Sequence, residues 1–167
     1  LDMPFMGTFS SDSYETGTRA ALFGGTTMVI DFILQKQGNS LHDALKDWQS
    51  RSDNNCVGDY SFHMAVTDFN EETKKEIKDF IETEGITSFK TFMAYKGALM
   101  IDDRQMIGLM EEVKAHGGLI NVHATNGDMI DYLVAKHKAE GKVAPLYHYF
   151  SQPEVTEAEA AERFTDM

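Results

Sequence analysis

Two side chains capable of chemistry, Lys90 and His123, stand in or at the end of apolar segments of this sequence. Lys90 lies within SFKTFMAY, where Phe89, Phe92 and Met93 predict a buried strand. An ammonium group there loses hydration, which lowers its pKa and favours the neutral, nucleophilic amine. Such an amine can form a Schiff base, or add carbon dioxide to become a carbamate that bridges two metal ions. The alternative is a lysine whose stem is buried while its ammonium group reaches water.

His123 closes the segment LINVHA, and the polar loop TNGD follows it at 125–128. Ligands and catalytic groups gather at the carboxyl ends of strands in α/β sheets, where a neutral imidazole is a good metal ligand. The alternative is a hydrogen-bonded core histidine. Because His123 follows Lys90 by 33 residues, on the next predicted strand, we expect both to point into one cavity. His63, in the middle of YSFHMAV, is interpreted as a hydrogen-bonded core histidine and is left out of the metal set.

The elements that must position these residues alternate along the chain. Apolar segments predict four strands, at 26–33, 60–66, 86–94 and 119–124. Helical periodicity and capping residues predict helices at 14–23, from Ser40 onward, from Asn70 to Gly85, at 102–116, before Gly141 and at 154–164. Each strand segment is apolar on both faces, which indicates a parallel sheet with helices outside, in one domain.

The length leaves two architectures open. An eight-stranded βα barrel takes about 250 residues. Four βα units in 167 residues are therefore either half of such a barrel or a small doubly wound sheet.

Composition excludes several classes of function. A formal net charge of −12 leaves no basic surface for nucleic acid and disfavours an anionic membrane. The sequence has no apolar run of the ~20 residues that span a bilayer, no phosphate-binding loop and no G-x-S-x-G elbow. Cys56 is the single cysteine, so an internal disulfide is impossible and a cytoplasmic location is expected.

Four stretches of the sequence together resemble the dihydropyrimidinase and D-hydantoinase family of cyclic amidohydrolases. They are LDMPFMGTFSSDSYETGTRAALFGGTTMVIDF, DYSFHMAV, SFKTFMAYKG and INVHATNGD, and the resemblance continues into LYHYFSQPEVTEAEAAERF. The resemblance implies a metal-dependent TIM-type (β/α) barrel, of which 1–167 would be about half. Its products would be N-carbamoyl amino acids, made by opening a dihydropyrimidine or 5-substituted hydantoin ring.

The resemblance also implies roles for individual residues. Lys90 would be the carboxylated lysine that bridges two zinc ions per subunit, and His123 would ligate one of them. Tyr95 would hydrogen-bond the substrate and stabilise the oxyanion that forms on ring opening. The apolar residues that contact the ring substituent would be Met3, Phe5, Phe92 and Leu99. The assembly implied is a homotetramer that binds a small cyclic amide.

The sequence departs from the family pattern in two respects. The family has a His-x-His pair just before the LDMPF-like segment and further ligands after the stretch that matches 1–167, so the chain carries two of the six metal-site positions and lacks the proton-shuttling aspartate. We therefore expect a fragment or part of a larger hydrolase, inactive by itself. In addition, Thr125 stands where the family usually has Glu.

Three alternatives to a hydantoinase-type enzyme remain. A catalytically silent relative that acts as an interaction protein would lack metal-site residues, whereas Lys90 and His123 are present. Allantoinase or dihydroorotase chemistry is a second alternative, disfavoured by the sequence context of Tyr95. A small parallel-sheet binding domain without metal is the third.

Overall fold

A four-stranded parallel sheet forms the centre of the computed structural model, which describes residues 1–5 and 7–167, without the side chain of Phe5. Its strands are β3 (Met28–Leu34), β4 (Asp59–Ala65), β5 (Ser88–Phe92) and β6 (Leu119–His123). Each lies within two residues of its predicted ends, and every pairing is parallel. The prediction of a parallel sheet is confirmed.

The predicted helices are all present. They are α1 (Tyr14–Phe23), α2 (Leu41–Ser52), α3 (Glu71–Glu82), α4 (Asp103–Ala115), α5 (Gly127–Ala139) and α7 (Val155–Asp166). Ser40 and Asn70 cap α2 and α3 as expected, because their side-chain oxygens accept hydrogen bonds from backbone N–H groups of the first turn. Within the described residues, no helix combines the length and the apolar character that crossing a bilayer requires.

Three short elements were not predicted. The strands β1 (Pro4–Phe5) and β2 (Thr8–Phe9) form an antiparallel hairpin, and α6 (Leu146–Phe150) interrupts the polar connection before α7. Strands of two residues and a helix of five are too short for hydrophobic periodicity to reveal.

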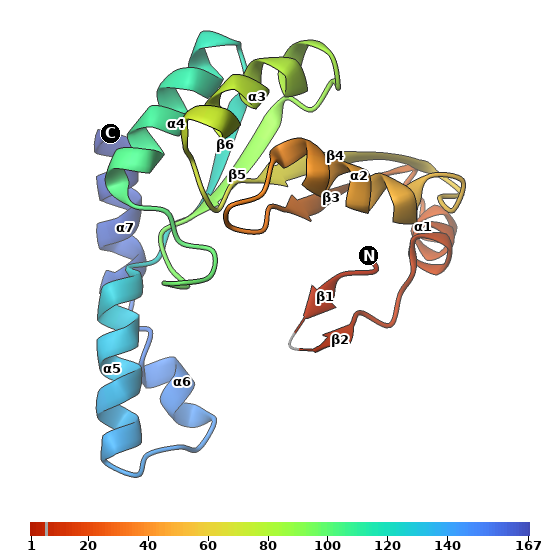
Figure 1. Ribbon diagram of the computed structural model, residues 1–167. Helices are drawn as coiled ribbons and strands as arrows, with labels where there is room; N and C mark the ends of the chain where they lie inside the picture. The colour runs from red at the N-terminus through yellow and green to blue at the C-terminus, as the bar shows by residue number, and fades with distance from the viewer. Residues whose placement is uncertain (6) are drawn as a thin grey trace.

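The strands follow one another across the sheet in the order β3-β4-β5-β6. Figure 1 shows α2, α3 and α4 along one side of this sheet, while α5, α6 and α7 extend from its β6 end. A doubly wound sheet would reverse its strand order and place helices on both faces. The described part of the chain does neither, so the sheet is singly wound.

Helices cover only one face of the sheet, although the strands carry apolar side chains on both faces, as expected. In β5, Phe89 and Thr91 are buried beneath the helices, whereas Lys90 between them is half-buried. On the side of Lys90, Ile30 is 49% exposed and Leu119 is 63% exposed. The physical reason is the winding: successive crossovers of the same hand place α2, α3 and α4 on the same side.

Gln35 joins the carboxyl ends of β3 and β4 from a buried position. Its side-chain oxygen accepts hydrogen bonds from the N–H groups of Thr67 (2.9 Å) and Asp68 (3.0 Å). Its amide nitrogen donates to the carbonyl oxygens of Asn39 (2.8 Å) and Asp68 (3.2 Å). One side chain thus satisfies the backbone of two loops at the strand ends.

Replacing Gln35 by Ala is expected to lower the free energy of unfolding by about 2–3 kcal/mol, because buried N–H groups lose their acceptor. Urea denaturation followed by circular dichroism measures this change. Gln37→Ala is the matched control, because Gln37 is exposed and makes one 3.5 Å contact with the Thr67 carbonyl oxygen. Equal denaturation midpoints for the two variants would contradict the structural role of Gln35.

Candidate active site

Lys90 and His123 lie on the open face of the sheet, on the neighbouring strands β5 and β6. In the register of these strands, Lys90 is opposite Asn121 and Phe92 is opposite His123. Opposite residues share a face, and so do residues two apart on one strand. Lys90 and His123 therefore lie on the same surface, with His123 two residues further along its strand than the position opposite Lys90. Within the described chain, the surface that both side chains share is open.

Lys90 is half-buried, and this burial lowers the pKa of its ammonium group. Its Nζ lies 5.1 Å from the centre of the Phe92 ring. Among the described residues, no side chain forms an ion pair or hydrogen bond with this nitrogen. Half-burial of Lys90 is compatible both with the expected chemistry of its amine and with the alternative of a buried stem whose ammonium group reaches water.

The ring of His123 packs beside two aromatic side chains. Its centroid is 5.9 Å from that of Phe92 and 5.2 Å from that of Tyr95. Burial lowers the pKa of His123, and the charge of Lys90 lowers it further, whereas the charge of Glu157 raises it. The imidazole is therefore biased toward the neutral form, which is the form that binds metal ions.

His63 lies closer to the candidate site than the sequence indicated. Its Nδ1 hydrogen-bonds to the Ser88 hydroxyl, which agrees with the predicted hydrogen-bonded role, and its ring packs 5.0 Å from that of Phe32. Burial and then the charge of Lys90 lower its pKa. The pairing of Ala65 with Lys90 places His63 on the same face, and this interstrand register was the signal missing from the sequence.

Tyr95 occupies the loop after β5 in the left-handed backbone region, with φ of 66°. Its carbonyl oxygen accepts hydrogen bonds from the N–H groups of Ala98 (3.0 Å), Leu99 (3.0 Å) and Met100 (3.2 Å). This conformation is sterically unfavourable for a residue with a Cβ atom, so the contacts of the surrounding turn must stabilise it. The side chain is 52% exposed and lies against His123 on the open side.

Gly127, the first residue of α5, locks the Tyr95 loop to the loop after His123. Its N–H donates to the Met93 carbonyl oxygen at 3.1 Å. A Cβ at this position would lie 2.9 Å from Ala94 Cα and 3.1 Å from the Met93 oxygen, both backbone atoms. Only glycine allows so close an approach. The ion pair between Lys96 and Asp128 joins the same two loops at the surface.

The predicted substrate-contact residues divide into two groups. Phe92 and Leu99 both contact Tyr95. The ring centroids of Phe92 and Tyr95 are 6.0 Å apart, and the Leu99 N–H donates to the Tyr95 carbonyl oxygen. Met3 belongs instead to the N-terminal segment, where its N–H donates to the Ser10 hydroxyl at 3.0 Å. Figure 1 shows this segment on the side of the molecule away from α5. The side chain of Phe5 lies outside the described residues.

Thr125 is 5% exposed, and its N–H donates to the His123 carbonyl oxygen at 3.2 Å. Within the described chain its hydroxyl has no hydrogen-bond partner. A Glu at this buried position would need an ionic partner, so the smaller, neutral Thr suits the packing that the structure shows.

Comparison with known proteins gives close relatives but no matching family model. A D-hydantoinase from Streptomyces coelicolor is 47% identical over 163 residues, which cover 98% of this chain and 35% of the relative. A dihydropyrimidinase from Rattus norvegicus is 42% identical, over 98% of this chain and 31% of the relative. The crystal structure of dihydropyrimidinase from Brevibacillus agri NCHU1002 superposes with a TM-score of 0.96 at 45% identity, over 99% of this chain and 36% of that one. The chain thus spans about a third of the length of the relatives it matches.

Competitive acylation of the metal-free protein is expected to distinguish Lys90 from Lys96. Burial lowers the pKa of Lys90 below 10.5, so its labelling should reach half-maximum at a lower pH than that of an ordinary lysine. Hydrogen bonding to Asp128 raises the pKa of Lys96, so its midpoint should be higher. Mass spectrometry across a pH series gives both midpoints. Asp128→Asn should lower the Lys96 midpoint alone, and a Lys90 midpoint at or above that of Lys96 would contradict the assignment.

Gly127→Ala is expected to destabilise the protein by about 1–3 kcal/mol, since the new Cβ meets backbone atoms that cannot rotate away. Gly24→Ala is the control: φ there is −83° and the nearest atom to a Cβ is 3.4 Å away. Denaturant unfolding should show little change for the control. If the two substitutions proved equally neutral, the close approach of the loops would be refuted.

Proposed function

Because this chain belongs, by homology over nearly its whole length, to the D-hydantoinase and dihydropyrimidinase family, we propose that the protein containing it hydrolyses cyclic amides. The substrates would be dihydropyrimidines or 5-substituted hydantoins, opened to N-carbamoyl amino acids. The observation that carries the proposal is the juxtaposition of Lys90 and His123 on one open face of a sheet that matches those of hydantoinases. The complete enzyme would be a longer polypeptide, since the chain matches about a third of its relatives.

The donors on this face fit the zinc centre that we propose for the complete protein. His123 offers a half-buried imidazole of lowered pKa, and Lys90 offers an amine that can be carboxylated to an oxygen ligand. Two zinc ions per subunit would supply Lewis-acid activation of water when bound. Lys90 and His123 would ligate these ions jointly with further ligands from the remainder of the protein.

Tyr95 would act on the substrate directly. Its hydroxyl would donate a hydrogen bond to the carbonyl oxygen of the ring amide, where negative charge develops during hydrolysis. The left-handed backbone at Tyr95 and the hydrogen bond from Gly127 to Met93 would position this side chain next to His123, so the loop would need little reorganisation on substrate binding. Phe92 and Leu99 would form the apolar surface for the ring substituent, joined by Met3 and Phe5 from the N-terminal segment.

In the complete enzyme, further chain would cover the open face. We propose that the singly wound sheet is about half of a (β/α) barrel, whose missing strands would contribute the remaining metal ligands and the aspartate that moves the proton. Exposed Ile30 and Leu119 would then become barrel interior. A homotetramer in the cytoplasm belongs to the same proposal. A subunit interface would cover apolar side chains such as Leu146 and Tyr149 of α6, which are exposed in this chain.

In the full-length protein, Lys90→Ala is expected to lower turnover of dihydrouracil and hydantoin on the order of 10³-fold and to remove the catalytic zinc. Lys96→Ala is the matched control, because Lys96 is an exposed lysine of the adjoining loop. Elemental analysis and a hydrolysis assay measure the two effects. The chain of 167 residues alone is expected to be inactive.

Three results would contradict the proposal. Wild-type zinc content in Lys90→Ala would exclude the bridging role of this lysine. A full-length protein that binds zinc but opens neither ring would favour allantoinase or dihydroorotase chemistry, and one that binds no zinc would favour a silent relative.

A further inference from the structure

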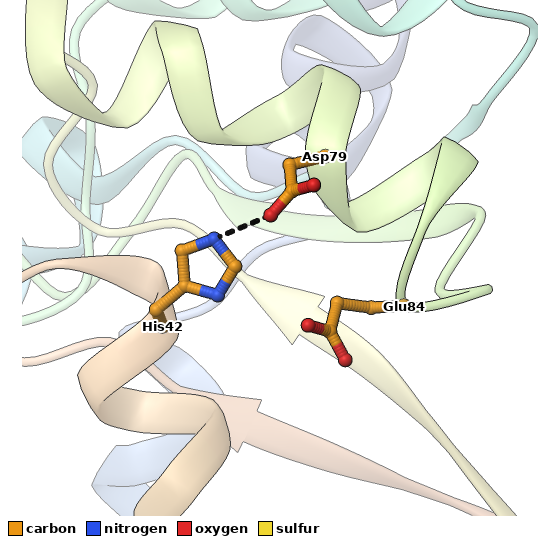
Figure 2. A group of neighbouring side chains, drawn as sticks. All are labelled: His42, Asp79 and Glu84. Carbon is orange, nitrogen blue, oxygen red and sulfur yellow. Dashed lines mark ion pairs between the residues drawn. The ribbon is translucent and has the colours of Figure 1, made fainter.

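We propose a second metal site, separate from the open face, formed by His42, Asp79 and Glu84 on the helical side of the sheet. Figure 2 shows His42 at the start of α2, Asp79 on α3 and Glu84 in the turn that follows α3. The three side chains come from two helices and a turn that are adjacent in space. The site would take a divalent ion that accepts both imidazole nitrogen and carboxylate oxygen, and we commit to Zn²⁺.

The spacing of the donor atoms is close to that of a coordinated ion. One donor atom from each residue lies within 4.8 Å of the other two, and His42 Nε2 is 2.9 Å from Asp79 Oδ2. Ligands about 2.1 Å from a tetrahedral zinc ion lie about 3.4 Å from one another. The His–Asp pair needs to open slightly, and the donor atom of the exposed Glu84 already lies within 4.8 Å of the other two.

The imidazole is held in place by contacts that do not involve the carboxylates of the site. Its ring packs against Phe80 with a centroid distance of 4.9 Å. Glu76 on α3 accepts hydrogen bonds from the Ser40 hydroxyl (2.5 Å) and the Leu41 N–H (2.8 Å), which fixes the start of α2 against α3. A ligand held in this way loses little freedom when it binds an ion.

The electrostatics of α3 favour a cation at this place. Asp79 lies in the last turn of the helix, where the backbone dipole is negative, and this turn holds no basic residue. Glu84 adds a second carboxylate just beyond the helix end. Mg²⁺ and Ca²⁺ prefer oxygen ligands alone, so the imidazole selects an ion of the Zn²⁺ type.

The bound ion would join α2 to α3 on the side of the sheet opposite to Lys90. Its role would be structural, because three protein donors on the helical layer are remote from the face that carries Tyr95 and His123. The site does not depend on the proposed function, since none of its residues faces the catalytic surface.

The test is the zinc stoichiometry of the full-length protein and of its Asp79→Asn/Glu84→Gln variant, dialysed against the same zinc buffer. Both substitutions keep the side-chain shape and remove the charge, so folding should be preserved, as circular dichroism would verify. We expect the variant to bind one equivalent fewer. Zinc-edge anomalous diffraction of the parent should show an ion between α2 and α3.

The same pair of substitutions in a Lys90→Ala background separates this site from the catalytic one. We expect one equivalent in Lys90→Ala and none in the triple variant. His116→Ala is the matched control, because His116 also pairs with two glutamates, Glu82 and Glu112, on a helical surface and should retain the ion. Equal zinc content with and without Asp79 and Glu84, in both backgrounds, would overturn the second site whatever the outcome for Lys90.

Discussion

The parallel register of β5 against β6 is the constraint on which the candidate site depends. It sets Phe92 opposite His123 and Lys90 opposite Asn121. A slip by one residue would turn His123 toward the helices and away from Lys90. The register continues beyond the strands, because Met93 donates to the His123 carbonyl oxygen at 3.1 Å. The hydrogen bonds that extend the sheet therefore also position the loop that carries Tyr95 and the loop that follows His123.

The open face gathers basic side chains that burial drives toward their neutral forms. Lys90, His63 and His123 all have lowered pKa values, and the charge of Lys90 lowers the pKa of both histidines. Burial of the imidazoles and the charge of Lys90 act in the same direction on the pKa values of His63 and His123, and both favour the neutral, electron-pair-donating form of each ring.

Much of the fold was accessible from the sequence, because apolar segments, caps and glycine stops act locally. Helix α1 has its predicted bounds, and Asn70 and Gly85 bracket α3 as expected, with Gly85 in the left-handed region. Features that depend on pairing were not accessible. The place of His63 beside Lys90 follows from the β4–β5 register, and the exposure of Ile30 follows from winding that puts helices on one side only. The resemblance supplied Tyr95, but nothing local in the sequence indicated its backbone conformation.

The two sides of the sheet differ in how they are stabilised. On the helical side, Glu76 fixes the start of α2 against α3, and Phe80 and Leu109 are fully buried. On the other side, Tyr95 adopts an unfavourable left-handed backbone conformation. Its strain is sustained by three hydrogen bonds to one carbonyl oxygen and by the backbone approach at Gly127. These contacts come from the loop after β5 and from the first residue of α5, so the loop and α5 together keep Tyr95 beside His123.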